Sequence, residues 1–356
     1  MKIPSKPRMQ DVANLAGVSL MTVSRTLNGS VPVSEQVRRK VQQAVATLNF
    51  RPNETARSLR EGRSRSIGLI VPNFYDPFFA MCAHAITVVA NAHAYSVIVT
   101  TSDEDPEIEF KVAGSMLRRH VEGMLVIPAT ERKSKLSGEE FRSTPIVTLD
   151  RPLRGDHFSS VIVDNRGGAK EATSHLIQHG HKRICYLSLS RNTFTHRVRY
   201  QGYRQAMVTA GLVPTAHFNC GSREETYAIL RSLIDSPERP TALFAGNNLV
   251  MRHLLHALSA MKVKIPGNMA VAGFDDFDMA DIFHPALTVV RQPAHDLGRS
   301  AAELLFARLG KKQKSAAVKQ IMLPVELIVR RSCGCSPRGE VNVIGSARNR
   351  KEVMVP

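Results

Sequence analysis

The chain has 356 residues, of which 43% are hydrophobic and 22% are charged, enough for two or three domains with sizeable cores. Lysine and arginine outnumber aspartate and glutamate by 48 to 31, so the formal net charge is +17. Such an excess favours nucleic acid as a partner. We find neither an apolar run of about 18 residues nor an apolar segment behind the basic start. We therefore expect no membrane partner and a cytoplasmic protein.

The positive charge is concentrated in residues 1–65, which contain twelve lysines and arginines against four acidic residues. We expect helices over residues 11–16, 20–27 and 34–48. Val12, Leu15 and Ala16 recur at helical spacing in the first helix, Gly17 suits a tight turn, and Ser19 can cap the second helix. Two short helices joined by a glycine-containing turn and followed by a supporting helix are typical of a helix-turn-helix domain. An inert three-helix bundle is the alternative.

The second of these helices has two distinct faces. At about 100° per residue, Met21 and Arg25 lie opposite Val23 and Leu27, which we expect in the core. Arginine can donate two hydrogen bonds to guanine, and methionine can contact a thymine methyl group. Leu20 is ambiguous, because the helical wheel places it near the buried side. The polar side chains with short donors suited to phosphates are Thr22, Ser24 and Asn28.

From Ser66 onward, short apolar runs alternate with amphipathic stretches of helical length. This pattern predicts an α/β fold with two doubly wound lobes, whose ligand site lies between the C-terminal ends of the strands. The predicted domains are a helix-turn-helix domain (8–50), a hinge helix (51–62), a two-lobed core (63–332) and a flexible tail (333–356). Within the core we expect lobe 1 to comprise 63–162 and 293–322, and lobe 2 to comprise 163–292 and 323–332.

Residues 51–59 predict a brief helix that Asn53 can cap. It is shorter than the roughly 12–15 residues that an isolated helix needs to persist in water. One interpretation is a flexible linker. The other is a helix that forms when two copies meet in the minor groove, where Leu59, which shares a face with Ala56, wedges between base pairs and kinks the duplex.

Several segments carry a family resemblance. The N-terminal run is DVANLAGVSLMTVSRTLNGSVPVSEQVRRKV, and later segments include HLIQHGHKRICYL, RPTALFAGNN and KIPGNMAVAGFDDFDMADIFHPALTVVRQP. Over roughly residues 8–333 the chain resembles the lactose-repressor/galactose-repressor family of bacterial transcription regulators. The resemblance implies base contacts from Leu20, Met21 and Arg25. It also implies a leucine wedge at Leu59 and a periplasmic-binding-protein-like core.

Polar residues at predicted strand ends and in the loops beyond them indicate a ligand cleft. They are Asp164, Arg199, Asn247 and Asp275. The resemblance places these four on effector-contacting positions, and Phe78 or Phe79 on the family's aromatic position. An aspartate at a strand end is also a common helix cap, so each residue alone has a structural alternative. One departure from the family stands out: Asn248 replaces the usual aspartate.

These features predict a dimeric, sequence-specific repressor of double-stranded palindromic operators, controlled by a small carbohydrate or sugar acid. Clustered arginines favour the acid, unless they are simply solvated: Arg191, Arg197, Arg199 and Arg223. We find no phosphate-loop, dinucleotide, nucleophile-elbow or zinc-protease motif, so we expect no enzyme and no cofactor. The competing hypotheses are a sugar transport receptor and a regulator that binds no small ligand, and a tetramer remains open.

The cysteines predict no disulfide framework. Cys82, Cys185 and Cys220 are isolated, and the one-residue gap of Cys333-Gly-Cys335 is a poor spacing for zinc. His179-Gly-His181 is a pair near a helix end, which is more often structural than a metal site. We expect reduced, structural thiols and no metal.

Overall fold

The computed structural model describes residues 7–28, 32–50, 63–131, 134–155, 158–310 and 318–335. The chain forms two compact units, Met1–Ser64 and Arg65–Pro356. Within the described ranges no helix is both long and apolar enough to cross a bilayer. The predicted hinge, with Asn53, Ala56 and Leu59, lies outside these ranges, as does the predicted tail beyond residue 335. The expectations for both stay predictions.

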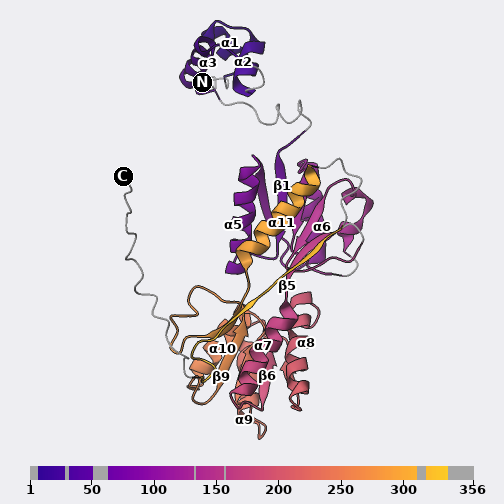
Figure 1. Cartoon of the computed structure of the whole chain (residues 1–356), viewed down its shortest axis with the longest axis vertical. Coiled ribbons are helices and arrows are strands. Elements are labelled where there is room, and N and C mark those ends of the chain that lie inside the picture. Colours follow the sequence, from indigo (N-terminus) through magenta and orange to yellow (C-terminus); the bar gives the residue numbers. More distant parts are fainter. Residues whose placement is uncertain are drawn as a thin grey trace, which may run out of the picture. The chain divides into compact units, whose positions relative to one another are not determined.

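The described part of the N-terminal unit forms the helices α1 (Met9–Ala16), α2 (Leu20–Asn28) and α3 (Glu35–Thr47), which Figure 1 labels. Gly17, at φ +64°, makes the turn between α1 and α2, a conformation that glycine adopts without steric cost. The core of the unit is made by Val12, Ala13, Ala16, Val23, Val41, Ala44 and Phe50.

The expected inward position of Leu15 is wrong, because this side chain is 53% exposed. The buried face of α1 is formed by Val12, Ala13 and Ala16. On the helical wheel these three residues span an arc centred between Val12 and Ala13, and Leu15 falls at its outer edge. The hydrophobic stripe is therefore rotated by part of a turn relative to the prediction.

The first lobe of the larger unit is a six-stranded parallel sheet in the order β11-β5-β4-β3-β1-β2. Its strands are β1 (Ser66–Val71), β2 (Ser96–Thr101), β3 (Gly123–Val126), β4 (Ile146–Leu149), β5 (Ser159–Val163) and β11 (Gln320–Leu323). Its helices are α5 (Pro77–Ala92), α6 (Pro106–Arg118) and α11 (Ala294–Leu309), with short 3₁₀ turns η1 (Lys135–Ser137) and η2 (Glu139–Phe141).

The second lobe has six strands in the order β12-β10-β9-β8-β6-β7, of which only β12 runs antiparallel to its neighbour. Its strands are β6 (Ile184–Leu187), β7 (Thr215–His217), β8 (Ala242–Ala245), β9 (Ala270–Phe274), β10 (Thr288–Arg291) and β12 (Glu326–Ile328). Its helices are α7 (Asn165–Gln178), α8 (Phe194–Thr209), α9 (Arg223–Asp235) and α10 (Asn248–Ala260).

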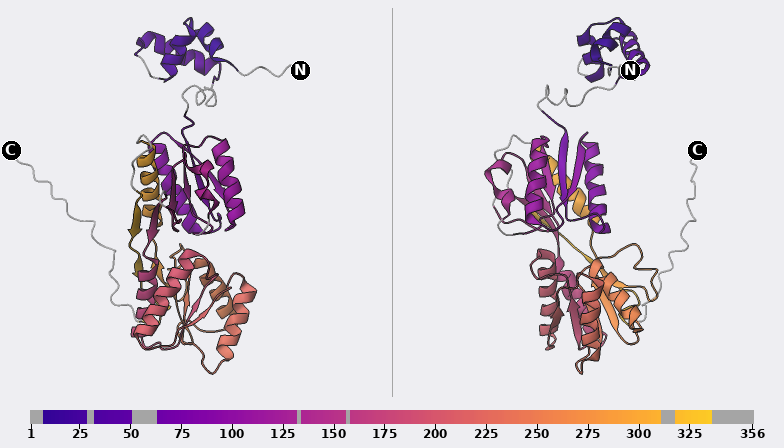
Figure 2. Two further views of the ribbon diagram at one scale, coloured as in Figure 1. Left: turned by 90° about the vertical axis from the view of Figure 1, so that its right-hand side faces the viewer. Right: turned by 180° about the vertical axis from the view of Figure 1, so that it is seen from behind.

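The chain passes between the two lobes after β5, after β10 and after β11, and Figure 2 shows these connections from two further sides. Each sheet packs against two hydrophobic clusters. In the first lobe, one cluster includes α5 and α11 and the other includes α6. In the second lobe, one cluster includes α10 and the other includes α7 and α8. This arrangement confirms the predicted α/β fold class. It also brings the C-terminal ends of strands from both sheets toward the boundary between the lobes.

Candidate nucleic-acid interface and ligand cleft

One face of α2 presents apolar and basic side chains to solvent. Leu20 is 45% and Met21 is 63% exposed, while Val23 is fully buried. Arg25, one turn after Met21, is also exposed, and among the described residues it has no hydrogen bond or ion pair. Leu20 is therefore accessible beside the predicted pair, which the helical wheel alone left open. This face offers a cation and apolar groups to a groove.

The start of α2 is fixed by its own side chains. The Thr22 backbone N–H donates to Ser19 Oγ at 3.1 Å, and the two hydroxyl groups of these residues are 2.8 Å apart. Ser19 is therefore the N-cap that the sequence predicted. Ser24 is half-buried on this helix, and Asn28 is its last residue, with its side chain outside the described part.

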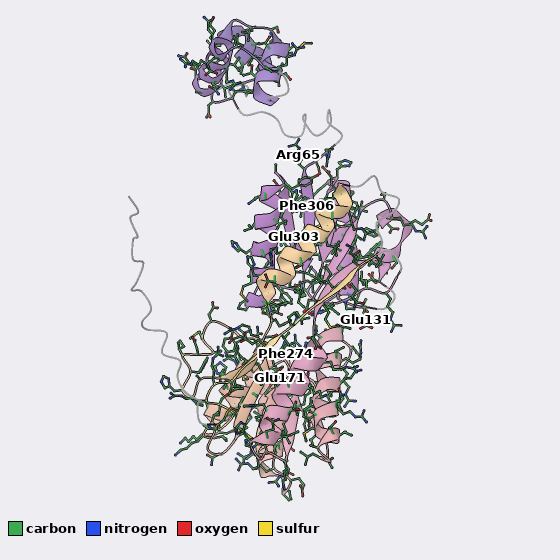
Figure 3. All side chains as sticks on the ribbon, viewed as in Figure 1. Arg65, Glu131, Glu171, Phe274, Glu303 and Phe306 are labelled. Atoms are coloured by element: carbon green, nitrogen blue, oxygen red, sulfur yellow. A yellow bond between two sulfur atoms is a disulfide. The ribbon has the colours of Figure 1, made fainter. Side chains whose placement is uncertain are left out.

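A buried arginine organises the strand ends of the second lobe. Arg199, 3% exposed on α8, donates from Nε to Asn165 Oδ1 at 2.8 Å and from Nη1 to the Gly246 carbonyl at 2.8 Å. Its Nη1 also lies 3.3 Å from Asp275 Oδ2. The guanidinium packs on the Phe274 ring at 3.8 Å, which Figure 3 labels in this lobe. Burial of the charge is thus offset by a carboxylate, two neutral acceptors and an aromatic face.

Two aspartates occupy equivalent positions in the two lobes. Asp150 directly follows β4 and Asp275 directly follows β9, and both have left-handed backbones with φ of +65° and +75°. Strained residues of this kind concentrate at functional sites. Asp275 also accepts a hydrogen bond from Gln292 Nε2 at 2.5 Å. Burial raises the pKa of Asp150 to about 6, although Arg151 and Arg199 oppose the shift.

Two of the predicted cleft residues are engaged as helix caps. Asp164 accepts from the Gly167 N–H at 2.7 Å at the start of α7, and Asn247 accepts from the Val250 N–H at 3.0 Å at the start of α10. The neighbour of Asp164, Asn165, contacts Arg199 instead. The sequence analysis did not select Asn165, Asp150 and Gln292. All three are polar residues just beyond the end of a strand, which is the criterion that selected Asp275.

Asn248 joins the two lobes. Its Nδ2 donates to Asp76 Oδ1 in the first lobe at 2.9 Å, and its backbone N–H points to Asp275 Oδ2 at 3.4 Å. Asp76 also caps α5 through the Phe78 N–H. Burial and the nearby Asp275 charge raise the pKa of Asp76, while the Asn248 amide lowers it. The departure from the family pattern therefore places a donor where two carboxylates already lie close.

A second contact between the lobes is an ion pair of Arg197 on α8 with Glu131, which Figure 3 labels where the first lobe borders the second. Arg191 packs on the Phe218 ring at 4.3 Å, and Arg223 is exposed at the start of α9. With Arg199 held by Asp275, the four clustered arginines do not form a common cationic surface.

The predicted aromatic residues lie in the core of the first lobe. Phe78 and Phe79 are each 7% exposed and pack edge to face with ring centroids 5.5 Å apart. The exposed rings of this segment are Phe74 and Tyr75, at 60% and 67%. These two side chains follow β1 and offer free aromatic faces.

A pocket of about 530 Å³ lies between the start of α5 and α10. It is lined by Pro77, Asn248, Arg252, Leu255, His256, Ser259, Phe277, Asp278, Met279 and Phe283. It shares Asn248 with the polar cluster, but neither Arg199 nor Asp275 lines it. The polar cluster and this largely apolar pocket are therefore neighbours that share Asn248.

Comparison with known proteins accounts for both units. The model for bacterial regulatory proteins of the lacI family matches residues 8–53, and the model for a periplasmic binding protein-like domain matches residues 173–333. The chain is 31% identical over 327 residues to the ribose operon repressor of Halalkalibacterium halodurans, spanning 90% of this chain and 96% of that protein. The chain belongs to the lacI family of bacterial regulatory proteins.

Solved structures agree with this assignment. A complex of the transcriptional regulator CelR with cellobiose is 29% identical, with a TM-score of 0.67, and covers 92% of this chain and 99% of its own. The lac repressor dimer bound to operator and the anti-inducer ONPF has a TM-score of 0.79 at 24% identity and the same coverage, which shows the shared fold. The resemblance predicted from the sequence is confirmed, and this lacI-family protein is a DNA-binding transcriptional regulator.

Proposed function

We propose that this lacI-family regulator is a repressor that binds a palindromic operator as a homodimer and responds to a small carbohydrate. The observation that carries the DNA-binding part is the exposed Leu20–Met21–Arg25 face of α2, opposite the buried Val23. A helix that is anchored by its buried side and exposes apolar side chains and an arginine on the other side can enter a major groove and contact base edges. Ser19 is also proposed to contact the DNA, and Thr22, Ser24 and Asn28 are proposed to contact phosphates around the helix.

The hinge segment completes the proposed contact. Asn53, Ala56 and Leu59 are assigned to the minor groove, where two copies of the segment meet and Leu59 inserts between base pairs. A twofold dimer presents two recognition helices to two half-sites, which explains why a palindrome is the expected target. Ligand binding in the core changes operator affinity by changing how the two hinge segments pair.

The proposed effector site is the polar cluster at the strand ends. Arg199 and Asp275 are the central pair, and Asp164 and Asn247 lie at the starts of α7 and α10. The aromatic contact at Phe78 or Phe79 stays a prediction that requires one of these core side chains to move toward the ligand. The two buried arginines of the cleft, Arg151 and Arg199, are already paired with carboxylates. Because no unpaired buried cation remains among these residues, the cluster favours a neutral polyhydroxy ligand over a sugar acid.

We further propose that the protein has no catalytic activity and uses no cofactor, in line with a relative that is a ribose operon repressor. It acts in the cytoplasm, where its DNA target lies. Turnover of candidate sugars by the purified protein would contradict the absence of catalytic activity.

The test selects operator fragments from genomic DNA with the full-length protein and then measures binding to the selected site and to scrambled duplexes. We expect at least about a 1,000-fold preference for the selected site. A panel of neutral sugars and matching sugar acids is then added, and one neutral sugar should change the operator Kd by about 5- to 150-fold. Equal binding to every duplex would overturn the DNA-binding proposal, and a response to sugar acids alone would overturn the neutral effector.

A further inference from the structure

Three side chains with metal-binding chemistry meet at the far end of α7 from the ligand cleft. His175 lies in the last turn of α7, and Cys333 and Cys335 lie in the segment that follows β12. Two of the sequence features that looked unrelated, the Cys-Gly-Cys pair and the histidines around residue 179, are therefore adjacent in space. The transcriptional function uses none of them.

The ligand atoms are close and the segment that carries the cysteines is firmly held. His175 Nε2 lies 3.3 Å from Cys333 Sγ and 3.3 Å from Cys335 Sγ. The two cysteines are joined as a disulfide, so the expectation of reduced thiols is wrong for this pair. Ser332 fixes the segment, because its hydroxyl donates to the Val271 carbonyl at 2.6 Å and accepts from the Thr288 N–H at 2.8 Å.

A surrounding layer of polar groups orients the cluster. The Thr288 hydroxyl donates to Cys333 Sγ at 3.2 Å, and Cys333 is fully buried. Nearby, His181 Nδ1 lies 3.1 Å from Thr241 Oγ1. Metal sites characteristically have such a second layer, which fixes the direction of the ligating atoms.

We propose that the reduced form of this cluster is a binding site for a thiolate-preferring cation, with Zn²⁺ as the representative ion. Two cysteine thiolates and an imidazole are the ligands that zinc prefers. With Zn–S near 2.3 Å and Zn–N near 2.0–2.1 Å, a tetrahedral site separates its ligand atoms by about 3.4–3.8 Å. Both His–Cys separations here are close to this range.

The chemistry has two steps. A dithiol or phosphine reductant supplies two electrons, and with two protons the Cys333–Cys335 bond becomes two thiols. The cation then binds with the loss of both thiol protons. The disulfide and the metal complex are therefore mutually exclusive states of one site, and only the reduced state binds metal.

Metal binding fastens the C-terminal segment of the core to α7. The opposite end of α7 begins with Asn165, which holds Arg199 in the ligand cleft. A bound cation therefore stabilises the helix that supports the cleft, because a metal that binds only the folded chain adds its binding free energy to stability.

The test uses the full-length protein, stripped with a chelator and reduced with a phosphine under anaerobic conditions. Co²⁺ reports thiolate coordination by its charge-transfer absorption, and competition with Zn²⁺ gives the affinity. The variants are Cys335→Ser and His175→Gln, and His295→Gln on the exposed side of α11 is the matched control. Cys335 is only partly buried, so its replacement disturbs the core less than replacement of Cys333.

We expect one equivalent of metal in the wild type and the control, and at least about 100-fold weaker binding in both cluster variants, since outer-layer changes alone cost 10- to 100-fold. Zn²⁺ should raise the melting temperature of the reduced wild type but not that of His175→Gln. The oxidised protein should bind no metal. Absence of stoichiometric binding by the reduced wild type, or unchanged binding in His175→Gln, would overturn the proposal.

Discussion

Asn248 donates to Asp76 a hydrogen bond that an ionised carboxylate at the same position is unable to donate. Asp76 and Asp275 both lie near this residue, and the charge of Asp275 already raises the pKa of Asp76. An aspartate at position 248 would be a third negative charge in the same buried space. The asparagine therefore contributes a hydrogen bond between the lobes where an ionised aspartate would add repulsion.

Replacing Asn248 with aspartate should weaken the contact between the lobes. We expect the variant to lose about 1–3 kcal/mol of unfolding free energy at neutral pH, because it loses the hydrogen bond and gains repulsion. Asn248→Ala, which removes the bond without adding charge, should lose only about 1 kcal/mol. The measurement is chemical denaturation between pH 5 and 8.

The pH dependence separates repulsion from a packing defect. Two close carboxylates share a proton more readily as the pH falls, so Asn248→Asp should regain stability toward pH 5, whereas Asn248→Ala should not. Equal losses in the two variants at both pH values would show that the negative charge is unimportant.

Arg25 is the single side chain on which base reading by α2 depends most. Its replacement by alanine should weaken binding to the selected operator by about 1–3 kcal/mol while leaving binding to random DNA nearly unchanged. Arg39→Ala on α3 is the control, since this exposed arginine pairs with Glu35 at 3.6 Å and should affect all duplexes alike. Fluorescence anisotropy at fixed salt measures both affinities. A loss of the same size on random DNA would assign Arg25 to the phosphates.

At the scale of the element, α6 contains a buried carboxyl group with an unusual titration. Glu109 is 1% exposed and accepts from the Ala129 N–H at 2.7 Å, and burial raises its pKa to about 7. Because the pKa in the folded state lies above the ordinary value, the folded chain binds this proton more tightly than the unfolded chain. The associated stability is present below about pH 4.5 and is lost as the pH rises through about 7.

Glu109→Gln should remove this pH dependence, since the amide retains an acceptor and carries no charge. Between about pH 4.5 and 8, the variant should gain about 3 kcal/mol of unfolding free energy relative to the wild type. Glu107→Gln on the same helix is the control, because this exposed residue pairs with Lys135 at the surface. Parallel stability curves for the wild type and Glu109→Gln would contradict the expectation.

The elements themselves were largely predictable, for a local reason. Most of the short apolar runs of the body become buried strands, as in β8, where all four residues are buried. The exception is β2 at the edge of the first sheet, where no residue is fully buried. The outward positions of Met21 and Arg25 and the buried position of Val23 followed from helical geometry, whereas the exposure of Leu20 did not. The position of Leu15 was not predictable, because a pattern of three apolar residues does not fix the rotation of a short helix within its core.

The candidate sites were predictable only in part, because their geometry is long-range. Arg199 and Asp275 could be selected one at a time, but their pairing across 76 residues could not be derived from local pattern. Asn248 was noticed without its partner, which lies 172 residues away. The His175–Cys333 contact spans 158 residues, so spacing rules for metal motifs do not detect it.

At the scale of the whole molecule, the two compact units have separate hydrophobic cores. The helix-turn-helix cluster contains residues from Val12 to Phe50, and the clusters that serve the two sheets are drawn entirely from the larger unit. A ligand of the larger unit therefore stabilises a hydrophobic core that the helix-turn-helix does not share. We expect its influence on DNA binding to pass through the hinge and the dimer.

Calorimetry of the full-length protein should accordingly resolve two unfolding transitions that respond to different ligands. A sugar present at about 100 times its Kd should stabilise the larger unit by about 2.7 kcal/mol and leave the transition of the helix-turn-helix unit unchanged. Operator DNA should raise the transition of the smaller unit. In Asp275→Asn, which weakens the pairing with Arg199, the response to sugar should shrink while the response to DNA persists. If sugar alone moved both transitions equally, the two units would be energetically coupled in the absence of DNA. A hinge helix that forms only on DNA would then not be the route of coupling between them.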